Sequence, residues 1–369
     1  YARLIRVNNL RAIHNNRKDR DIKPKTIIEE NESYLNKLIE IVRLENLIKE
    51  LNGFHKKYQR LTELKMLDWL ESFKKDHIPN DINTLQSEPA KLLWYKLKGA
   101  YYLSKSDYEG TFLYRTKMIE WWNKHPDMIG ADPDQYIASV HNFIQYAIAN
   151  KEFEIASDTI SEFERNSAKF SKNEGRIYTL LIQCKLLILA NSYQISGVPL
   201  LGKKLQQDLK NLDLLFRDEL KLRINMLALY FISELWESSW EMAKQIIDMP
   251  KKNIRLDWRQ WAHIAYLISL RECGELELLD PAFRSAKRFV KQFNEDSKNA
   301  YFTTTLTKLK PILEASDPKP GCKKLLAELE EKYPHDKNTP VGFEEFISWV
   351  RHKISGRKII DTIKELEEL

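Results

Sequence analysis

Glycine and proline are scarce in this chain, which has 11 glycines and 13 prolines among 369 residues. Both residue types interrupt helices, so their scarcity disfavours a fold made of many turns, loops and edge strands. Leucine, lysine, glutamate, isoleucine and alanine dominate instead, and 43% of the residues are hydrophobic, enough to bury a large core. The composition predicts an all-α protein whose helices are joined by short turns.

Cysteine is scarce as well. The three cysteines, Cys184, Cys273 and Cys322, are far apart and odd in number, which argues against a disulfide framework and against the paired spacing of a zinc site. No two of the eight histidines lie one helical turn apart, as a metal-binding pair on one helix would. We expect no metal, no cofactor and a reducing, cytoplasmic location.

Long apolar runs and a strong charge of one sign are also missing. The most apolar segment, residues 177–190, is interrupted by Gln183 and Lys185 and is shorter than the ~20 residues that span a bilayer. The net charge is only +6, whereas a dedicated nucleic-acid binder usually concentrates more positive charge on one face. These absences argue against a membrane-spanning protein and against a dedicated nucleic-acid binder.

One segment comes close to a nucleotide-binding motif. Residues 196–205 read SGVPLLGKKL, in which Gly197 to Lys203 match G-x-x-x-x-G-K. A phosphate-binding loop needs a preceding strand, free backbone N–H groups and a Ser or Thr after the lysine. Here the preceding pattern is helical, Pro199 lacks an N–H, and Lys204 replaces the hydroxyl residue. We therefore predict a loop between helices, with the lysines in the first turns of the next helix.

Motifs for catalysis are not recognisable either. No Ser-His or Cys-His arrangement has a known local context. The acidic clusters at residues 328–332 and 364–369 are typical of solvated helix faces with i,i+4 ion pairs. We predict that the protein has no catalytic residues and is not an enzyme.

Helical hairpins recur along the chain. In residues 92–122, a helical run with Gly99 and Tyr102 is followed by a polar turn at residues 104–107 and by Tyr108, which opens a second helix. Two further hairpins have an aromatic residue after the turn and an alanine three residues later: Phe153 with Ala156, and Trp240 with Ala243. The spacing predicts another unit near Tyr193, and a weaker hairpin turns at Gly274. Tyr108 and Phe153 are 45 residues apart, closer to the ~40 to 47 residues of some paired-helix repeats than to the ~34 of the tetratricopeptide repeat.

A small residue in the first helix and an aromatic residue after the turn resemble a degenerate tetratricopeptide repeat. The resemblance implies a right-handed α-solenoid of antiparallel helix pairs, with the first helix of each pair on the inner wall. We predict an N-terminal helical region in residues 1–80, repeats in residues 81–317 and a C-terminal helical cap in residues 318–369.

The resemblance also implies a function, which is to bind a protein or peptide on the inner wall. Lys96 and Asn142 occupy positions where that family often holds a partner's backbone or terminal carboxylate. Four further residues are expected to face the same way: His141, Gln145, Lys185 and Arg271. We predict a non-catalytic scaffold or adaptor.

An alternative is a nucleic-acid-associated helical-repeat protein. The stretch at residues 250–263, PKKNIRLDWRQWAH, interleaves cations with aromatic rings that could hold phosphates and stack on bases. Its candidate residues are Lys251, Lys252, Arg255, Trp258, Arg259 and Trp261. The competing interpretation is that the two tryptophans are core residues between hairpins.

Overall fold

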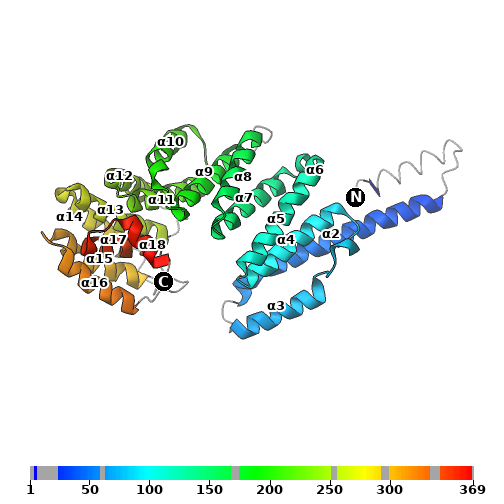
Figure 1. Cartoon of the computed structure of the whole chain (residues 1–369), viewed down its shortest axis with the longest axis horizontal. Coiled ribbons are helices and arrows are strands. Elements are labelled where there is room, and N and C mark those ends of the chain that lie inside the picture. The colour runs from blue at the N-terminus through cyan, green and yellow to red at the C-terminus, as the bar shows by residue number, and fades with distance from the viewer. Residues whose placement is uncertain are drawn as a thin grey trace. The chain divides into compact units, whose positions relative to one another are not determined.

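The computed structural model describes residues 4–5, 24–58, 63–167, 174–250, 256–291, 299–332 and 341–367. Within these ranges the chain forms α-helices, labelled α2 to α18, with short 3-10 helices and no strand (Figure 1). The prediction of an all-α protein is confirmed. The chain divides into two compact units, residues 1–165 and 166–369.

Unit 1 contains seven of the described helices. They are α2 (Pro24–Tyr58), α3 (Glu63–His77), α4 (Glu88–Ser104), α5 (Tyr108–Lys124), α6 (Pro126–Ala131), α7 (Pro133–Ala149) and α8 (Phe153–Asn166). The starts of α4, α5 and α7 are set locally, because the side chains of Ser87, Asp107 and Asp132 each accept a hydrogen bond from a backbone N–H three residues later. Pro89 and Pro133 occupy the first turns of α4 and α7, where a missing N–H costs nothing.

The core of unit 1 has two sides that meet at α4. One apolar side of α4 packs against α2 and α3 in a cluster that includes Leu44, Leu70 and Leu97. On the other side, α4 packs against α5, where Leu92 meets Trp122. Because α4 is covered on both sides, it anchors the unit.

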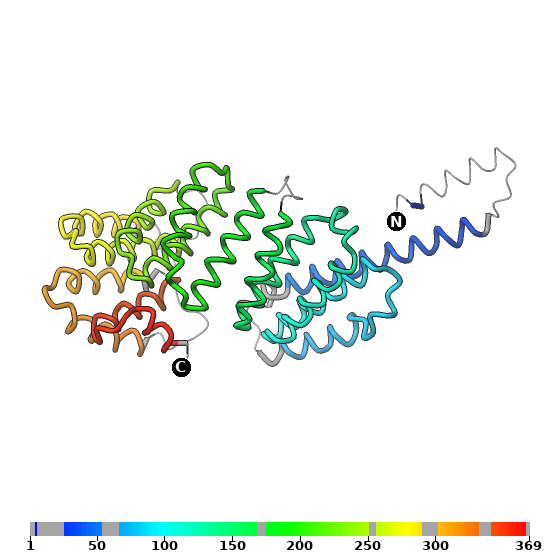
Figure 2. Tube along the Cα trace, turned by 45° about the horizontal axis from the view of Figure 1, so that its top comes forward, coloured from blue at the N-terminus to red at the C-terminus, as the bar shows by residue number. Residues whose placement is uncertain are grey.

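Unit 2 contains the other ten described helices. They are α9 (Glu174–Asn191), α10 (Val198–Asn211), α11 (Phe216–Ile232), α12 (Trp236–Asp248), α13 (Leu256–Cys273), α14 (Leu279–Lys291), α15 (Asn299–Glu314), α16 (Lys319–Lys332), α17 (Phe343–Ser355) and α18 (Ile359–Glu367). Their buried side chains form one continuous cluster that runs from α9 to α18. Figure 2 traces the successive helices along the chain.

The same turn recurs between helices in both units. Residues 106, 151, 193, 234 and 274 all have a left-handed backbone, with φ between 57° and 81°, and they are 40 to 45 residues apart. After four of them, at residues 107, 152, 235 and 275, the next backbone N–H donates to the carbonyl five residues earlier, which is the hydrogen bond of a Schellman motif. The hairpins predicted near Tyr193 and Gly274 therefore have the expected turns.

Each turn is followed, five residues after its left-handed residue, by a buried position in the next helix. The exposed fraction there is 0% for Thr111, Ala156, Val198 and Ser239 and 4% for Leu279. This register corrects one prediction. Because α12 begins at Trp236, the aromatic residue that follows the turn is Trp236 and not Trp240. The small residue three positions later is therefore Ser239 and not Ala243. The sequence around this turn carries two tryptophans four residues apart, and only the backbone turn at Glu234 decides between them.

The C-terminal helices α17 and α18 lie along earlier helices of unit 2 (Figure 1). Glu272 of α13 accepts a hydrogen bond from Trp349 Nε1 at 2.9 Å and forms an ion pair with Lys353 at 2.6 Å. Glu234, in the turn before α12, accepts a hydrogen bond at 2.9 Å from the N–H of Ile359, the first residue of α18. These contacts tie the end of the chain to α11 and α13.

The segment that resembles a phosphate-binding loop is helical. Gly197 ends a 3-10 helix, and α10 begins at Val198 with Lys203 and Lys204 exposed on it. Gly202 is buried in α10, where a Cβ atom would collide with the ring of Tyr230. The prediction that the lysines lie in the first turns of the next helix is confirmed. The predicted loop before them is instead a 3-10 helix that leads directly into α10, and Gly202 has a packing role.

Candidate functional site

One face of each first helix can be followed through the molecule by counting back from the left-handed residue of its turn. The positions nine and six residues before that residue define what we call the wall face. They are Leu97 and Ala100 in α4, Asn142 and Gln145 in α7, Cys184 and Leu187 in α9, Asn225 and Ala228 in α11, and Ala265 and Ile268 in α13. Equivalent positions can therefore be compared directly.

Both wall-face positions are buried in α4 and α13, and in α9 and α11 this face lines a pocket. In α4, Leu97 and Ala100 pack in the cluster with α2 and α3. In α9 and α11, Leu187, Asn225 and Ala228 line a pocket of about 250 Å³ together with residues of α17 and α18. In α13, Ala265 and Ile268 are fully buried, and Glu272 bonds to α17.

The wall face of α7 is different. Asn142 and Gln145 are half-buried, and so are the neighbouring His141 and Tyr146. Here the sequence changes from the apolar pair of α4 to two amides, each of which offers donors and an acceptor. Among the described first helices, α7 is the one with an amide side chain at both wall-face positions.

A pair of cations lies beside this face. Arg115 of α5 is only 7% exposed, and its guanidinium carbon is 5.8 Å from the ring centre of Tyr146 on α7. Its Nη1 contacts the sulfur of Met118, but its Nε has no hydrogen-bond partner, and no described acidic residue forms an ion pair with it. The guanidinium packs over Gly99 of α4, where a Cβ atom would be in ordinary contact with it at 3.5 Å.

Lys96 of α4 is the second cation. It is half-buried and forms no hydrogen bond or ion pair with any described residue. Burial lowers the pKa of Lys96, and the positive charge of Arg115 lowers it further, while Asp132 and Glu45 act more weakly in the opposite direction. Burial likewise lowers the pKa of Arg115. Neither cation forms an ion pair with a described carboxylate, and two neighbouring cations of this kind favour an anionic group brought by a partner.

Arg115 was missed by the sequence reasoning. Its signal was its place on the buried stripe of α5, because Thr111, Arg115, Met118 and Trp122 follow helical spacing and are all less than 9% exposed. A charged residue on such a stripe is uncommon unless it is paired.

The other predicted wall residues lie in unit 2. Lys185 is half-buried in α9, and Arg271 is half-buried in α13. Arg271 Nη2 donates a hydrogen bond at 3.1 Å to the carbonyl of Ala315, just after the end of α15. Arg271 therefore has a contact within the fold of unit 2. The other four predicted wall residues, Lys96, His141, Asn142 and Gln145, all belong to unit 1.

The basic and aromatic stretch does not form an exposed surface in its described part. Lys251, Lys252 and Arg255 lie outside the described residues. Trp261 is 1% exposed and packs against Phe231 with ring centres 5.1 Å apart. Arg259 is 3% exposed, and Trp258 is half-buried. Neither Trp261 nor Arg259 is accessible to a base or a phosphate, which reduces the support for a nucleic-acid function.

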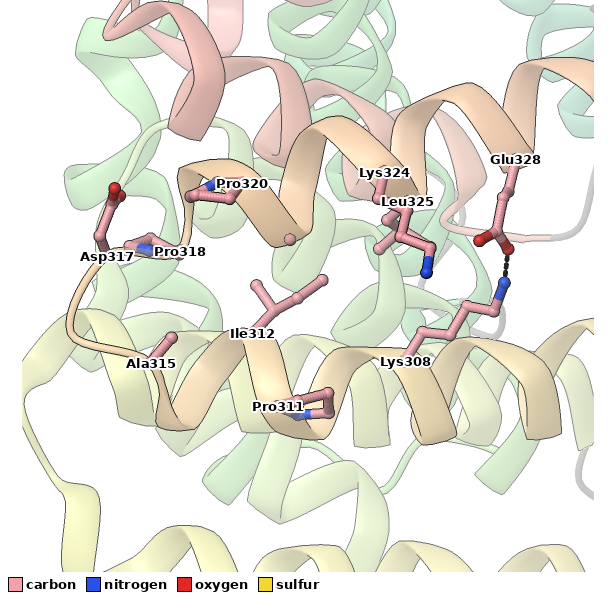
Figure 3. A pocket seen from close by; sticks show the side chains of 11 residues that line it. Lys308, Pro311, Ile312, Ala315, Asp317, Pro318, Pro320, Lys324, Leu325 and Glu328 are labelled. Carbon is pink, nitrogen blue, oxygen red and sulfur yellow. Dashed lines mark ion pairs between the residues drawn. The ribbon is translucent and has the colours of Figure 1, made fainter.

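A pocket of about 480 Å³ lies between α15 and α16 (Figure 3). Apolar side chains, among them Pro311, Ile312 and Leu325, form most of its lining. Lys308 and Glu328 form an ion pair at one end, and Lys324 reaches from α16 toward α15. Its chemistry suits an apolar group.

The described residues contain no group of three or more His, Cys, Asp or Glu side chains placed to hold a metal ion. None of the described helices combines the length and the apolarity that crossing a membrane requires. Comparison with protein-family models, with curated proteins and with solved structures found no match.

Proposed function

We propose that this protein is a non-catalytic scaffold that binds another polypeptide on the wall face of α7, with an acidic group of the partner beside Lys96 and Arg115. We further propose that its hairpins form a right-handed, tetratricopeptide-like solenoid, because the same turn recurs every 40 to 45 residues. The three cysteines are free, which supports a reducing cytoplasm as its location.

The observation that carries the proposal is the pair of amides on the wall face of α7, next to the cations Lys96 and Arg115. The same face of α4 is a binding surface for α2 and α3, and the same face of α11 lies opposite α17 and α18. By analogy with these intramolecular contacts, we propose that the wall face of α7 binds another helix or segment of polypeptide. On α7, Asn142 and Gln145 can pair with polar groups of a partner, including its backbone.

The charge of the partner follows from the cations. A buried guanidinium without an acidic partner is costly, and a carboxylate placed beside it would form charge-assisted hydrogen bonds. Arg115 and Lys96 therefore favour a segment rich in Asp or Glu, or one that ends in a free carboxylate.

The proposal is tested by the double variant Lys96→Ala/Asn142→Ala. Neither side chain supports the core, so we expect the free energy of unfolding to stay within roughly ±0.5 kcal/mol of the parent. Partners are captured from source lysate, identified by mass spectrometry and titrated against both proteins. The matched control is Asn123→Ala/Lys124→Ala, which removes the same residue types from exposed positions of α5.

We expect the wall variant to lose affinity and the control to keep it. If the wall variant folds and still binds every partner of the parent with equal affinity, the binding surface lies elsewhere and the proposal fails. It also fails if the variant unfolds, because these side chains would then be structural.

A further inference from the structure

Helix α2 has two apolar faces on opposite sides. Leu44, Leu47, Ile48 and Leu51 point toward α4 and are less than 9% exposed. At about 100° per residue, a second set falls on the opposite side of the helix. Its members are strongly exposed: Ile28 by 56%, Leu35 by 48%, Ile39 by 56% and Val42 by 46%. No described helix packs against this second face, which we call the outer stripe.

The outer stripe has the spacing of a coiled-coil seam. Positions 28, 32, 35, 39, 42 and 46 alternate steps of four and three residues, which places 32, 39 and 46 at a and 28, 35 and 42 at d of a heptad. Four of the six positions are apolar, while Glu32 and Asn46 are polar. The N-terminal half of α2 extends past α4 (Figure 1).

We propose that α2 pairs, antiparallel, with α2 of a second copy of this chain through the outer stripe. In an antiparallel pair, a positions of one helix pack against d positions of the other. The register that centres the pair near residue 37 stacks Leu35 on Ile39 of the second copy twice, by two-fold symmetry.

Charge and polarity at the flanks support this register over a parallel one. At the e positions, Glu29 of each copy lies opposite Arg43 of the other, and Asn36 lies opposite its own counterpart. At the g positions, Leu38 lies opposite its own counterpart. A parallel pair would instead place Glu45 opposite Glu50 of the second copy, where like charges repel. The residues beside the outer stripe therefore favour the antiparallel over the parallel orientation of the two copies of α2.

The proposal does not depend on the polypeptide partner proposed for α7, because it concerns a different helix and another copy of the same chain. The seam covers only about two heptads, and its outer layers contain Glu32 and Asn46, so we expect a weak dimer in exchange with monomer. Mass action then makes the dimer visible only at high chain concentration.

The first test is sedimentation equilibrium of the full chain, with the concentration raised to about 100 µM. We expect the weight-average mass to rise from 43.7 kDa toward twice that value. Leu35→Glu/Ile39→Glu should keep the monomer mass at every concentration and leave the thermal unfolding curve unchanged. The control Leu113→Glu/Ile155→Glu, which alters equally exposed apolar residues of α5 and α8, should dimerise as the parent does.

The second test fixes the orientation by disulfide trapping in a Cys273→Ser background, since Cys273 is the exposed one of the three cysteines. Asn36→Cys should form a crosslinked dimer under mild oxidation, because the two copies of residue 36 face each other. Arg43→Cys should not, because its counterpart lies 14 residues away, about 21 Å along the axis. A parent that stays monomeric, or equal crosslinking at both positions, would overturn the proposal.

Discussion

The substitution Arg115→Met separates the function of unit 1 from its stability. Arg115 is buried, its Nε lacks a hydrogen bond, and its charge has no acidic partner among the described residues. Methionine is similar in length, carries no charge, and can fill the same space between Gly99 and Met118. If the guanidinium serves to bind a partner's carboxylate, its removal should raise the free energy of unfolding of the unbound protein.

The size of the effect follows from two opposing contributions. A buried polar atom left without a hydrogen bond costs about 1 to 3 kcal/mol. The stacking of the guanidinium on Tyr146 returns about 0.5 to 2 kcal/mol, and the substitution loses it. We therefore expect Arg115→Met to raise the free energy of unfolding of unit 1 by about 1 kcal/mol, which is a rise in Tm of roughly 2 to 4 °C for a unit of this size.

The assay is calorimetric and urea-induced unfolding at neutral pH, combined with titration of the captured partner. Lys117→Met is the control, since it removes a positive charge from a half-buried position of the same helix and should stay within roughly ±0.5 kcal/mol. The variant Arg115→Met should gain stability and lose partner affinity. A loss of more than about 1 kcal/mol would mean that the guanidinium is satisfied within the fold, and unchanged affinity would mean that it does not meet the partner.

Three further substitutions probe unit 2. Gly202→Ala should destabilise it by about 1 to 3 kcal/mol, because the ring of Tyr230 must move, whereas Gly197→Ala meets only ordinary contacts and should be neutral in urea unfolding. Burial lowers the pKa of His263 in the folded protein to about 3. In the unfolded chain this imidazole takes up a proton at its ordinary pKa of about 6.5. The free energy of unfolding should therefore fall as the pH drops from about 6.5 toward 3. His263→Gln should remove this loss, measured as urea midpoints from pH 7 to pH 4; an identical pH profile would contradict it. Burial raises the pKa of Glu345 to about 7, so its folded form is protonated and stability falls as the pH rises from about 4.5 to 7. Glu345→Gln should flatten that fall, and a parent-like decline between those two pH values would refute the assignment.

Much of the fold could be predicted because its signals are local. The starts of α4 and α7 follow from Ser87 and Asp132, whose side chains satisfy backbone N–H groups within three residues. The turn at Gly274 was also predictable, since glycine adopts a left-handed backbone without strain. The turn at Glu234 was misplaced, because the residue there has no such preference and its conformation depends on the helices on both sides.

The sequence by itself determined that the protein is all-α and built of recurring hairpins, because composition, capping and helical spacing act over a few residues. It also marked Lys96 and Asn142 as candidates, though on resemblance alone. Only the tertiary structure decided that α2 and α3 cover α4 and that α17 and α18 lie along α11 and α13. It alone placed Arg115 in a buried position beside Lys96. These outcomes depend on which apolar faces far apart in the sequence bury one another, and no local pattern carries that information.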